Sequence, residues 1–188
     1  MRQFLKNNIA NALTAMRLVI AIYILILYFS NAKNWLWRCA GLFVFALLTD
    51  VVDGFVARKF HSVSNVGKLL DPICDKSLMF AMLLVLTLSK KVDLWVLIAY
   101  GIKEVLMLIG GLIFLCKKIV VFSNWIGKAA TVLFAIAIGL SVLDVSFSNY
   151  VMIAAVAWAI FALIQYGLKF VKELRIRKSV DEVHNTLS

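Results

Sequence analysis

The sequence has little proline and glycine and few cysteines, and each shortage excludes a kind of segment or site. One proline and nine glycines among 188 residues leave no Pro/Gly-rich linker and no low-complexity segment. The three cysteines include no C-x-x-C pair, which argues against a zinc site or a disulfide framework. Because no composition change divides the chain, we expect one domain over residues 1–188.

Hydrophobic residues are in excess, at 63% of the sequence against about half in a soluble domain. They fall into six runs, each long enough to cross a hydrocarbon core of about 30 Å. The runs are Leu13–Phe29, Trp35–Val56, Leu69–Leu88, Leu94–Leu115, Trp125–Leu143 and Tyr150–Phe170. The first run lacks a small-residue cleavage site, so we read it as a retained span. The sequence therefore predicts an all-α, polytopic membrane protein with six transmembrane helices in one bundle.

The net charge of +10 is concentrated between the apolar runs, which favours membrane topology over nucleic-acid binding. One side would carry Arg2, Lys6, Arg17, Arg58, Lys59, Lys68, Lys117, Lys118, Lys128, Lys169, Lys172, Arg175, Arg177 and Lys178. The other would carry only Lys33, Arg38, Lys90 and Lys91. By the positive-inside rule, the side rich in lysine and arginine is cytoplasmic. We therefore expect both termini on the cytoplasmic side of the cell membrane. Residues 172–188 form a polar tail, either a surface helix or partly disordered.

Four of the ten acidic residues lie at the cytoplasmic ends of the second and third spans: Asp50, Asp53, Asp71 and Asp75. The members of each pair lie about 40–60° apart on a helix, and two antiparallel helices would bring the pairs together. Such a group of like charges needs either partial protonation or neutralising cations. Carboxylate oxygens at this density suit Mg²⁺, with Mn²⁺ as an alternative. Ordinary salt bridges to Lys68, Lys76 or Arg58 are the competing interpretation.

The whole segment reads Asp50-x2-Asp53-Gly54-x2-Ala57-Arg58-x8-Gly67-x3-Asp71-x3-Asp75. It resembles the signature of the CDP-alcohol phosphotransferase family at every fixed position and in both gap lengths. Members of that family transfer a substituted phosphate from a CDP-linked donor to an alcohol and release CMP. The resemblance thus implies a membrane enzyme of phospholipid biosynthesis.

The resemblance also implies roles for individual residues. Asp50, Asp53, Asp71 and Asp75 would hold two Mg²⁺ ions, and Asp75 would be the catalytic base for the acceptor hydroxyl. Gly54, Ala57, Arg58 and Gly67 would contact the cytidine and diphosphate of the donor, with Ser64 as a further contact. The guanidinium of Arg58 suits two phosphate oxygens, although a positive-inside flank would also place an arginine here. Family members of this type are typically homodimers.

The N-terminal segment Asn11-Ala12-Leu13-Thr14-Ala15-Met16-Arg17 is similar to the opening of the phosphatidyl-transferring branch of the family. In that branch the donor is CDP-diacylglycerol, so Asn11 and Thr14 are candidate donor contacts. Helix capping is the alternative for these two residues. Arg17 would reach inward to phosphate or extend toward the membrane surface.

The acceptor is indicated less directly. The segments Leu70-Asp71-Pro72 and Trp125-Ile126-Gly127-Lys128 most resemble members whose acceptor is sn-glycerol 3-phosphate, which would give phosphatidylglycerophosphate. The acceptor phosphate would need cations, and the candidates are Lys128, Lys103, Lys117 and Lys118. Those members usually have Arg-Glu in place of Lys103-Glu104, and a lysine in place of Ala130. These differences leave open a lipid acceptor, as in a cardiolipin synthase using phosphatidylglycerol, or inositol phosphate or serine.

Two other classes of protein share some of these features. A transporter would spread polar residues through the membrane depth, whereas the aspartates here cluster at one face. A catalytically inactive scaffold would be expected to have lost a metal ligand, and all four are present. The sequence therefore favours the enzyme.

Overall fold

The computed structural model describes the backbone of residues 2–60, 67–116 and 125–186, and the side chains of residues 15–49, 76–113 and 125–168. Over these ranges the regular secondary structure is entirely helical, which confirms the all-α prediction. Six helices follow one another: α1 (Arg2–Phe29), α2 (Trp35–Phe60), α3 (Gly67–Leu88), α4 (Leu94–Cys116), α5 (Trp125–Val142) and α6 (Ser148–Thr186). Each of the six apolar runs coincides with one of these helices.

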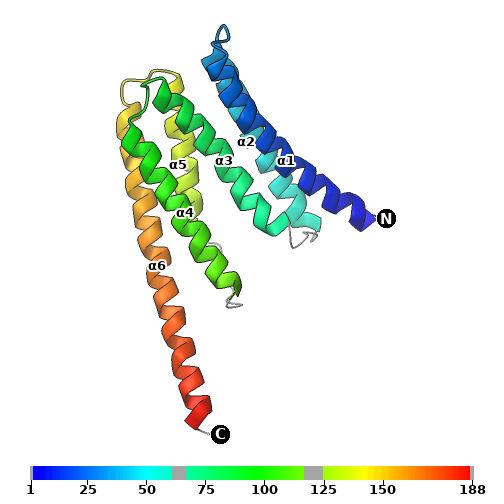
Figure 1. Ribbon diagram of the computed structural model, residues 1–188, viewed down its shortest axis with the longest axis vertical. Coiled ribbons are helices and arrows are strands. Elements are labelled where there is room, and N and C mark those ends of the chain that lie inside the picture. The colour runs from blue at the N-terminus through cyan, green and yellow to red at the C-terminus, as the bar shows by residue number, and fades with distance from the viewer. Residues whose placement is uncertain (1, 61–66, 117–124, 187–188) are drawn as a thin grey trace.

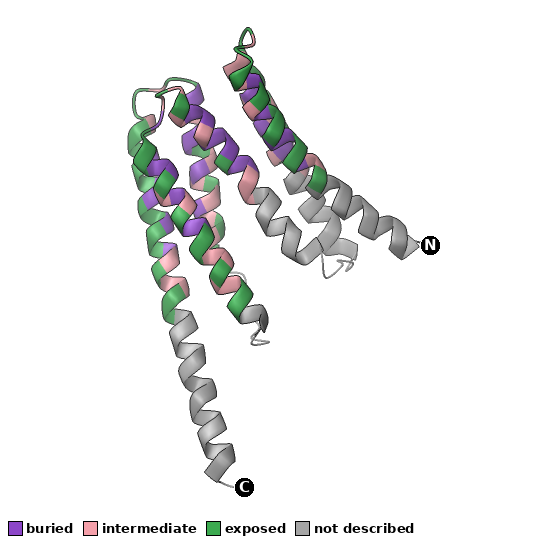
Figure 2. Cartoon of the chain, in the orientation of Figure 1, coloured by how far each residue is buried: buried purple, intermediate pink, exposed green. Residues whose placement is uncertain are grey.

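Three stretches of the described chain are long and apolar enough to cross a membrane: Leu94–Ile113, Trp125–Val142 and Ser148–Leu168. The described apolar parts of the first three helices are shorter: Ala15–Phe29, Trp35–Thr49 and Lys76–Leu88. Figure 2 shows exposed residues along the described parts of α1, α4 and α6. Many exposed residues of the described chain are large and apolar, including Val19, Trp37 and Leu168. An apolar exterior around an apolar core is what a lipid solvent permits, so these surfaces fit an integral membrane protein.

The helices pack in two groups that α3 connects. In one group α1 packs against α2 and α3, and in the other α6 packs against α4 and α5. Helix α3 also contacts α4 and α5, and Figure 1 shows it between the two groups. At the α4–α6 contact, a Cβ on Gly110 would lie only 2.9 Å from a ring carbon of Tyr166. The absence of a side chain at Gly110 therefore lets the Tyr166 ring pack directly on α4.

The short turns lie at one end of the bundle and both termini lie at the other (Figure 1). These turns join α1 to α2, α3 to α4, and α5 to α6. They contain the non-glycine residues with positive φ in the described chain: Asn31, Asn34, Lys90 and Asp144. An ion pair between Lys91 and Asp144 connects the second turn to the third. The carboxyl end of α2, the amino end of α3 and the amino end of α5 are consequently at the end that carries the termini.

Lys90 adopts a left-handed backbone conformation, with φ 59°, and this gives a stability prediction. That conformation costs about 1–2 kcal/mol for a residue with a side chain. Glycine adopts it without this strain, but its greater loss of backbone entropy on folding costs about 0.5–1 kcal/mol. We expect Lys90→Gly to stabilise the protein by roughly 0.5–1 kcal/mol, measured by thermal unfolding in detergent. Lys33→Gly is the matched control because Lys33 is another exposed turn lysine without a positive φ, and it should not stabilise. Equal shifts in both variants would contradict the assignment of strain to Lys90.

Several helix limits differ from the apolar runs, most of all the start of α1, which is at Arg2 rather than Leu13. Helix α3 begins at Gly67 rather than Leu69, so Pro72 lies in its second turn instead of its first. Helix α6 continues to Thr186, so the polar tail from residue 172 is helical as far as the structure describes it. Charged residues beyond residue 168 do not interrupt the helix because lysine, arginine and glutamate all have good helix propensity.

Candidate functional site

The four aspartates lie on two helices that contact each other. Asp50 and Asp53 are in the carboxyl-terminal half of α2, while Asp71 and Asp75 are in the first turns of α3. Only residues 61–66 separate these helices, and α2 contacts α3. Their backbones therefore bring both pairs toward the same end of the bundle, although the four side chains lie outside the described residues.

Most of the other predicted site residues also fall where side chains are not described. On described helices this applies to Asn11, Thr14, Gly54, Ala57, Arg58 and Gly67. Ser64, Lys117 and Lys118 lie outside the described residues altogether. The structure thus assigns each of these candidates, except Ser64, Lys117 and Lys118, to a helix. Their contacts remain predictions.

Next to Asp75 the structure describes a cluster of three charged side chains on α3 and α4. Lys103 Nζ lies 2.6 Å from Oε1 of Glu104, and Lys76 Nζ lies 3.2 Å from the same oxygen. Lys103 is 3% exposed and Glu104 is 7% exposed, whereas the side chain of Lys76 is 26% exposed. Two lysines thus share one carboxylate, so the cluster has a formal net charge of +1.

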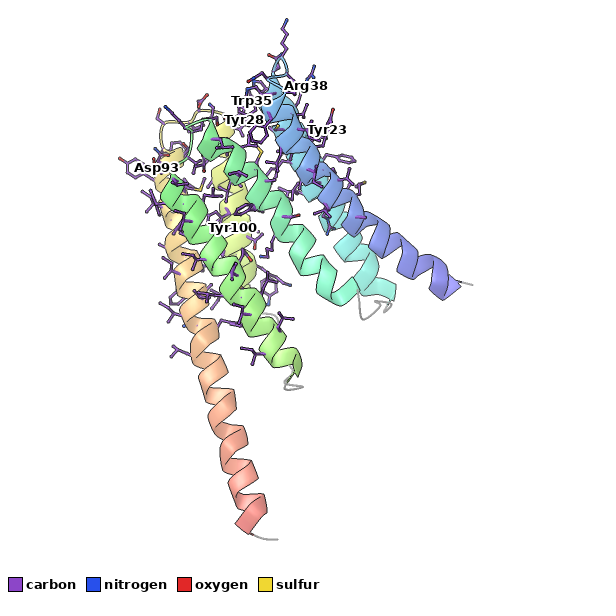
Figure 3. The ribbon with its side chains drawn as sticks, in the orientation of Figure 1. Tyr23, Tyr28, Trp35, Arg38, Asp93 and Tyr100 are labelled. Carbon is purple, nitrogen blue, oxygen red and sulfur yellow. The ribbon has the colours of Figure 1, made fainter. Side chains whose placement is uncertain are left out.

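Aromatic rings support the cluster from inside the bundle. Lys103 Nζ lies 5.6 Å from the ring centroid of Tyr100, within the range of a cation–π interaction. The Tyr100 ring in turn meets Phe134 of α5 edge to face, with centroids 4.9 Å apart; Figure 3 labels Tyr100 on α4. Lys103 is consequently held by both a carboxylate and a ring, which compensates its burial in an apolar helix.

An apolar groove of about 360 Å³ opens between α1, α3 and α4, beside this cluster. Its walls are apolar side chains of all three helices, including Leu18, Phe80 and Leu108. Lys76, Ser77 and Glu104 supply its polar lining. A groove with apolar walls and a charged group has the chemistry of a site for a lipid chain with a polar head.

Two basic residues toward the end of the bundle that carries the termini have contrasting surroundings. Arg17 on α1 is 6% exposed, so its side chain is directed into the protein and does not extend along the lipid-facing surface. Lys128 is exposed in the first turn of α5, with Nζ 5.8 Å from the ring centroid of Trp125. Lys103 is therefore inside the bundle beside α3, and Lys128 is on its surface.

The residues present suit divalent cations in their chemistry. Two pairs of carboxylates on contacting helices offer hard oxygen ligands, which Mg²⁺ and Mn²⁺ prefer. Among the side chains that the structure describes, no group of three metal-ligating residues is found elsewhere. The predicted aspartates are thus the candidates for a metal centre.

The ion pair between Lys76 and Glu104 was not predicted from the sequence. The sequence interpretation considered Lys76 only as a partner of the aspartates. A usable signal existed: Glu104 is an acidic residue inside an apolar run, and such a residue needs a partner inside the bundle, which an adjacent helix can supply. Which helix supplies it depends on packing, which the sequence pattern does not give.

The comparisons with known proteins agree with the aspartate signature. The family model described as CDP-alcohol phosphatidyltransferase matches residues 7–161. A CDP-diacylglycerol–glycerol-3-phosphate 3-phosphatidyltransferase from Aquifex aeolicus is 33% identical, over 86% of this chain and 95% of the relative. The protein of the same name from Mycoplasma genitalium is also 33% identical, over 77% of this chain and 68% of the relative.

A probable phosphatidylglycerophosphate synthase from Mycobacterium tuberculosis is 29% identical, over 96% of this chain and 87% of the relative. Because the family model covers most of the helical core, the match includes both aspartate pairs and the Lys76–Glu104 cluster. The family generally uses divalent metal ions. This chain belongs to the CDP-alcohol phosphatidyltransferase family.

Proposed function

We propose that this protein transfers the phosphatidyl group of CDP-diacylglycerol to sn-glycerol 3-phosphate, giving phosphatidylglycerophosphate and CMP. The observation that carries the proposal is the match of the family model across both helices that bear the aspartates. The names of the relatives from Aquifex and Mycoplasma support CDP-diacylglycerol as donor and glycerol 3-phosphate as acceptor.

The proposed topology has six transmembrane spans in a single domain, with both termini and the active site on the cytoplasmic side of the cell membrane. The termini and the ends of α2 and α3 that carry the aspartates lie at the same end of the bundle, which supports this arrangement (Figure 1). The excess of lysine and arginine near that end supports its cytoplasmic orientation. A homodimer in the bilayer is part of the proposal.

In the proposed reaction, an acceptor hydroxyl attacks the β-phosphorus of the donor. A new P–O bond forms there, and the bond to the CMP phosphate oxygen breaks. Asp75 receives the hydroxyl proton, and Arg58 binds diphosphate oxygens through its two-pronged guanidinium. Two Mg²⁺ or Mn²⁺ ions, held by Asp50, Asp53, Asp71 and Asp75, would supply charge stabilisation for the diphosphate. Asn11, Thr14, Gly54, Ala57, Ser64 and Gly67 complete the proposed donor site.

The acceptor phosphate is proposed to bind near the buried cluster. The cluster has a formal net charge of +1, which favours an anionic acceptor beside Asp75. Lys103 is the first proposed cation because it binds the same Glu104 oxygen as Lys76 of α3, and the proposed set also includes Lys128, Lys117 and Lys118. Ala130 is fully buried in the apolar core, so this position supplies no cation to the acceptor.

The groove between α1, α3 and α4 is the proposed seat of a donor acyl chain. Gly101 lines it, and a Cβ there would only reach ordinary contact with Phe80, 3.6 Å away. We expect Gly101→Leu to raise KM for CDP-diacylglycerol by roughly tenfold, with a smaller change in kcat, because a bulky side chain would occupy space used by the chain.

The control for this prediction is Gly111→Leu on the same helix, which gains the same helix propensity. Gly111 does not line the groove, and a Cβ there meets no atom within 4 Å. Steady-state kinetics with CDP-diacylglycerol in mixed micelles would measure both variants. Equal KM values for both variants and the parent protein would place the donor chains elsewhere.

The function itself is tested by CMP release from purified protein with CDP-diacylglycerol, Mg²⁺ and one acceptor at a time. Glycerol 3-phosphate is expected to support release, and phosphatidylglycerophosphate should be the product. Release only with phosphatidylglycerol would make the protein a cardiolipin synthase, and inositol phosphate and serine test the remaining acceptors. Failure with every acceptor and both metals would favour a transporter or an inactive scaffold.

A further inference from the structure

Lys76 directly follows Asp75, yet its ammonium group is held on the neighbouring helix. Its Nζ lies 3.2 Å from Oε1 of Glu104 on α4, across a contact between two helices that are joined at the opposite end of the bundle. Lysine carries its charge on a flexible four-carbon stem. An ammonium group released from Glu104 would remain near the end of the bundle that carries the aspartates, because Lys76 directly follows Asp75.

An ammonium group among carboxylates competes with a metal ion for the same negative charge. Unit charges about 4 Å apart interact by several kcal/mol at the effective dielectric near a protein surface, and by more for a divalent ion. A lysine that neutralised one aspartate would therefore weaken metal binding. Pairing with Glu104 instead gives the Lys76 charge a carboxylate that is not one of the four aspartates.

We propose that Glu104 is a positioning residue that holds Lys76 on α4 and thereby keeps the four aspartates available for divalent metal. The inference rests on the proposed metal-binding function of Asp50, Asp53, Asp71 and Asp75. Glu104 acts through Lys76 and is not assigned any contact with substrate or metal. Its burial, at 7% exposed, fixes the carboxylate between the two helices.

The test must distinguish the role of Lys76 from that of Lys103, because both ammonium groups contact the same oxygen of Glu104. Lys103 Nζ lies 2.6 Å from Oε1 of Glu104, and Lys103 is almost fully buried. Removing Glu104 alone would leave the Lys103 charge without its carboxylate and would destabilise the fold. The test therefore uses a Lys103→Met background, in which Glu104 has only Lys76 as its partner within the cluster.

The experiment measures Mn²⁺ binding by electron paramagnetic resonance on purified protein in lipid nanodiscs, without donor or acceptor. Three proteins are compared: Lys103→Met, Lys103→Met/Glu104→Gln, and Lys76→Met/Lys103→Met/Glu104→Gln. We expect the second to bind Mn²⁺ with a dissociation constant at least about fivefold higher than the first, because the released ammonium competes for the carboxylates. The third should return to within about twofold of the first because the competing charge is gone.

The outcomes separate positioning from a general structural role. Unchanged Mn²⁺ affinity in the double variant would overturn the inference, since Lys76 would not need Glu104. Equal weakening in the double and triple variants would also overturn it, because loss of packing would then explain the effect. Asp75→Asn and the parent protein serve as references: a parent that binds no Mn²⁺ would refute the metal site itself, and with it the inference.

Discussion

Asp75→Asn is expected to reduce the rate of CMP release by at least about a thousandfold. A general base contributes roughly 10²–10⁴ in rate, and the same side chain is a proposed metal ligand whose loss adds to the effect. Asparagine has nearly the same volume and keeps one carbonyl oxygen, so the change removes charge and basicity with little change in packing. The measurement is kcat for CMP release under saturating CDP-diacylglycerol, acceptor and Mg²⁺.

Asp144→Asn is the matched control for this substitution. Asp144 is at the opposite end of the bundle, its side chain is 72% exposed, and asparagine tolerates its positive φ. We expect activity within about twofold of the parent, because loss of an exposed ion pair changes little. Thermal unfolding of both variants checks that they are folded. An Asp75→Asn protein that is folded and retains a tenth or more of the parent rate would remove Asp75 from the proposed chemistry.

The helices could be predicted closely from the sequence because the membrane sets their length. Apolar runs near twenty residues need backbone hydrogen bonds within each segment, and the helix is the available solution. The runs at Trp35, Leu94 and Trp125 begin at the same residues as α2, α4 and α5. A helix was one of the two expectations for the polar tail, but its continuity with α6 as far as Thr186 was not predicted, because a polar sequence with good helix propensity has no apolar pattern to mark its end.

The site could be predicted in part. The spacing of Asp50, Asp53, Asp71 and Asp75 indicated a shared location, and the contact between α2 and α3 agrees with it. The buried cluster could not be predicted fully, because it depends on which face of α4 meets α3. Hydrophobic periodicity is weak in a helix that is apolar all round, so the sequence gives little information about the facing of Glu104.

Glu104→Gln is expected to destabilise the protein by about 3–5 kcal/mol, the cost of breaking a buried ion pair and leaving a charge behind. Lys103 would keep its ring contact with Tyr100 but lose the carboxylate at 2.6 Å. Lys103→Met/Glu104→Gln should recover most of this loss, because no buried charge remains without its counterion. The measurement is the unfolding midpoint in detergent for both variants and the parent.

Lys76→Gln serves as the comparison for a partner that is less buried. Its side chain is 26% exposed, and Glu104 would keep Lys103 as its counterion, so we expect a loss of about 1 kcal/mol or less. Because Lys103 and Lys76 bind the same oxygen, their substitutions should not be additive. If Glu104→Gln and the double variant are equally unstable, the hydrogen bonds of Glu104 and not its charge would hold α3 to α4. Recovery in the double variant would instead show that Glu104 stabilises the protein by neutralising the buried charge of Lys103. The contact of Glu104 with Lys76 would then contribute little to stability and could act on the metal site.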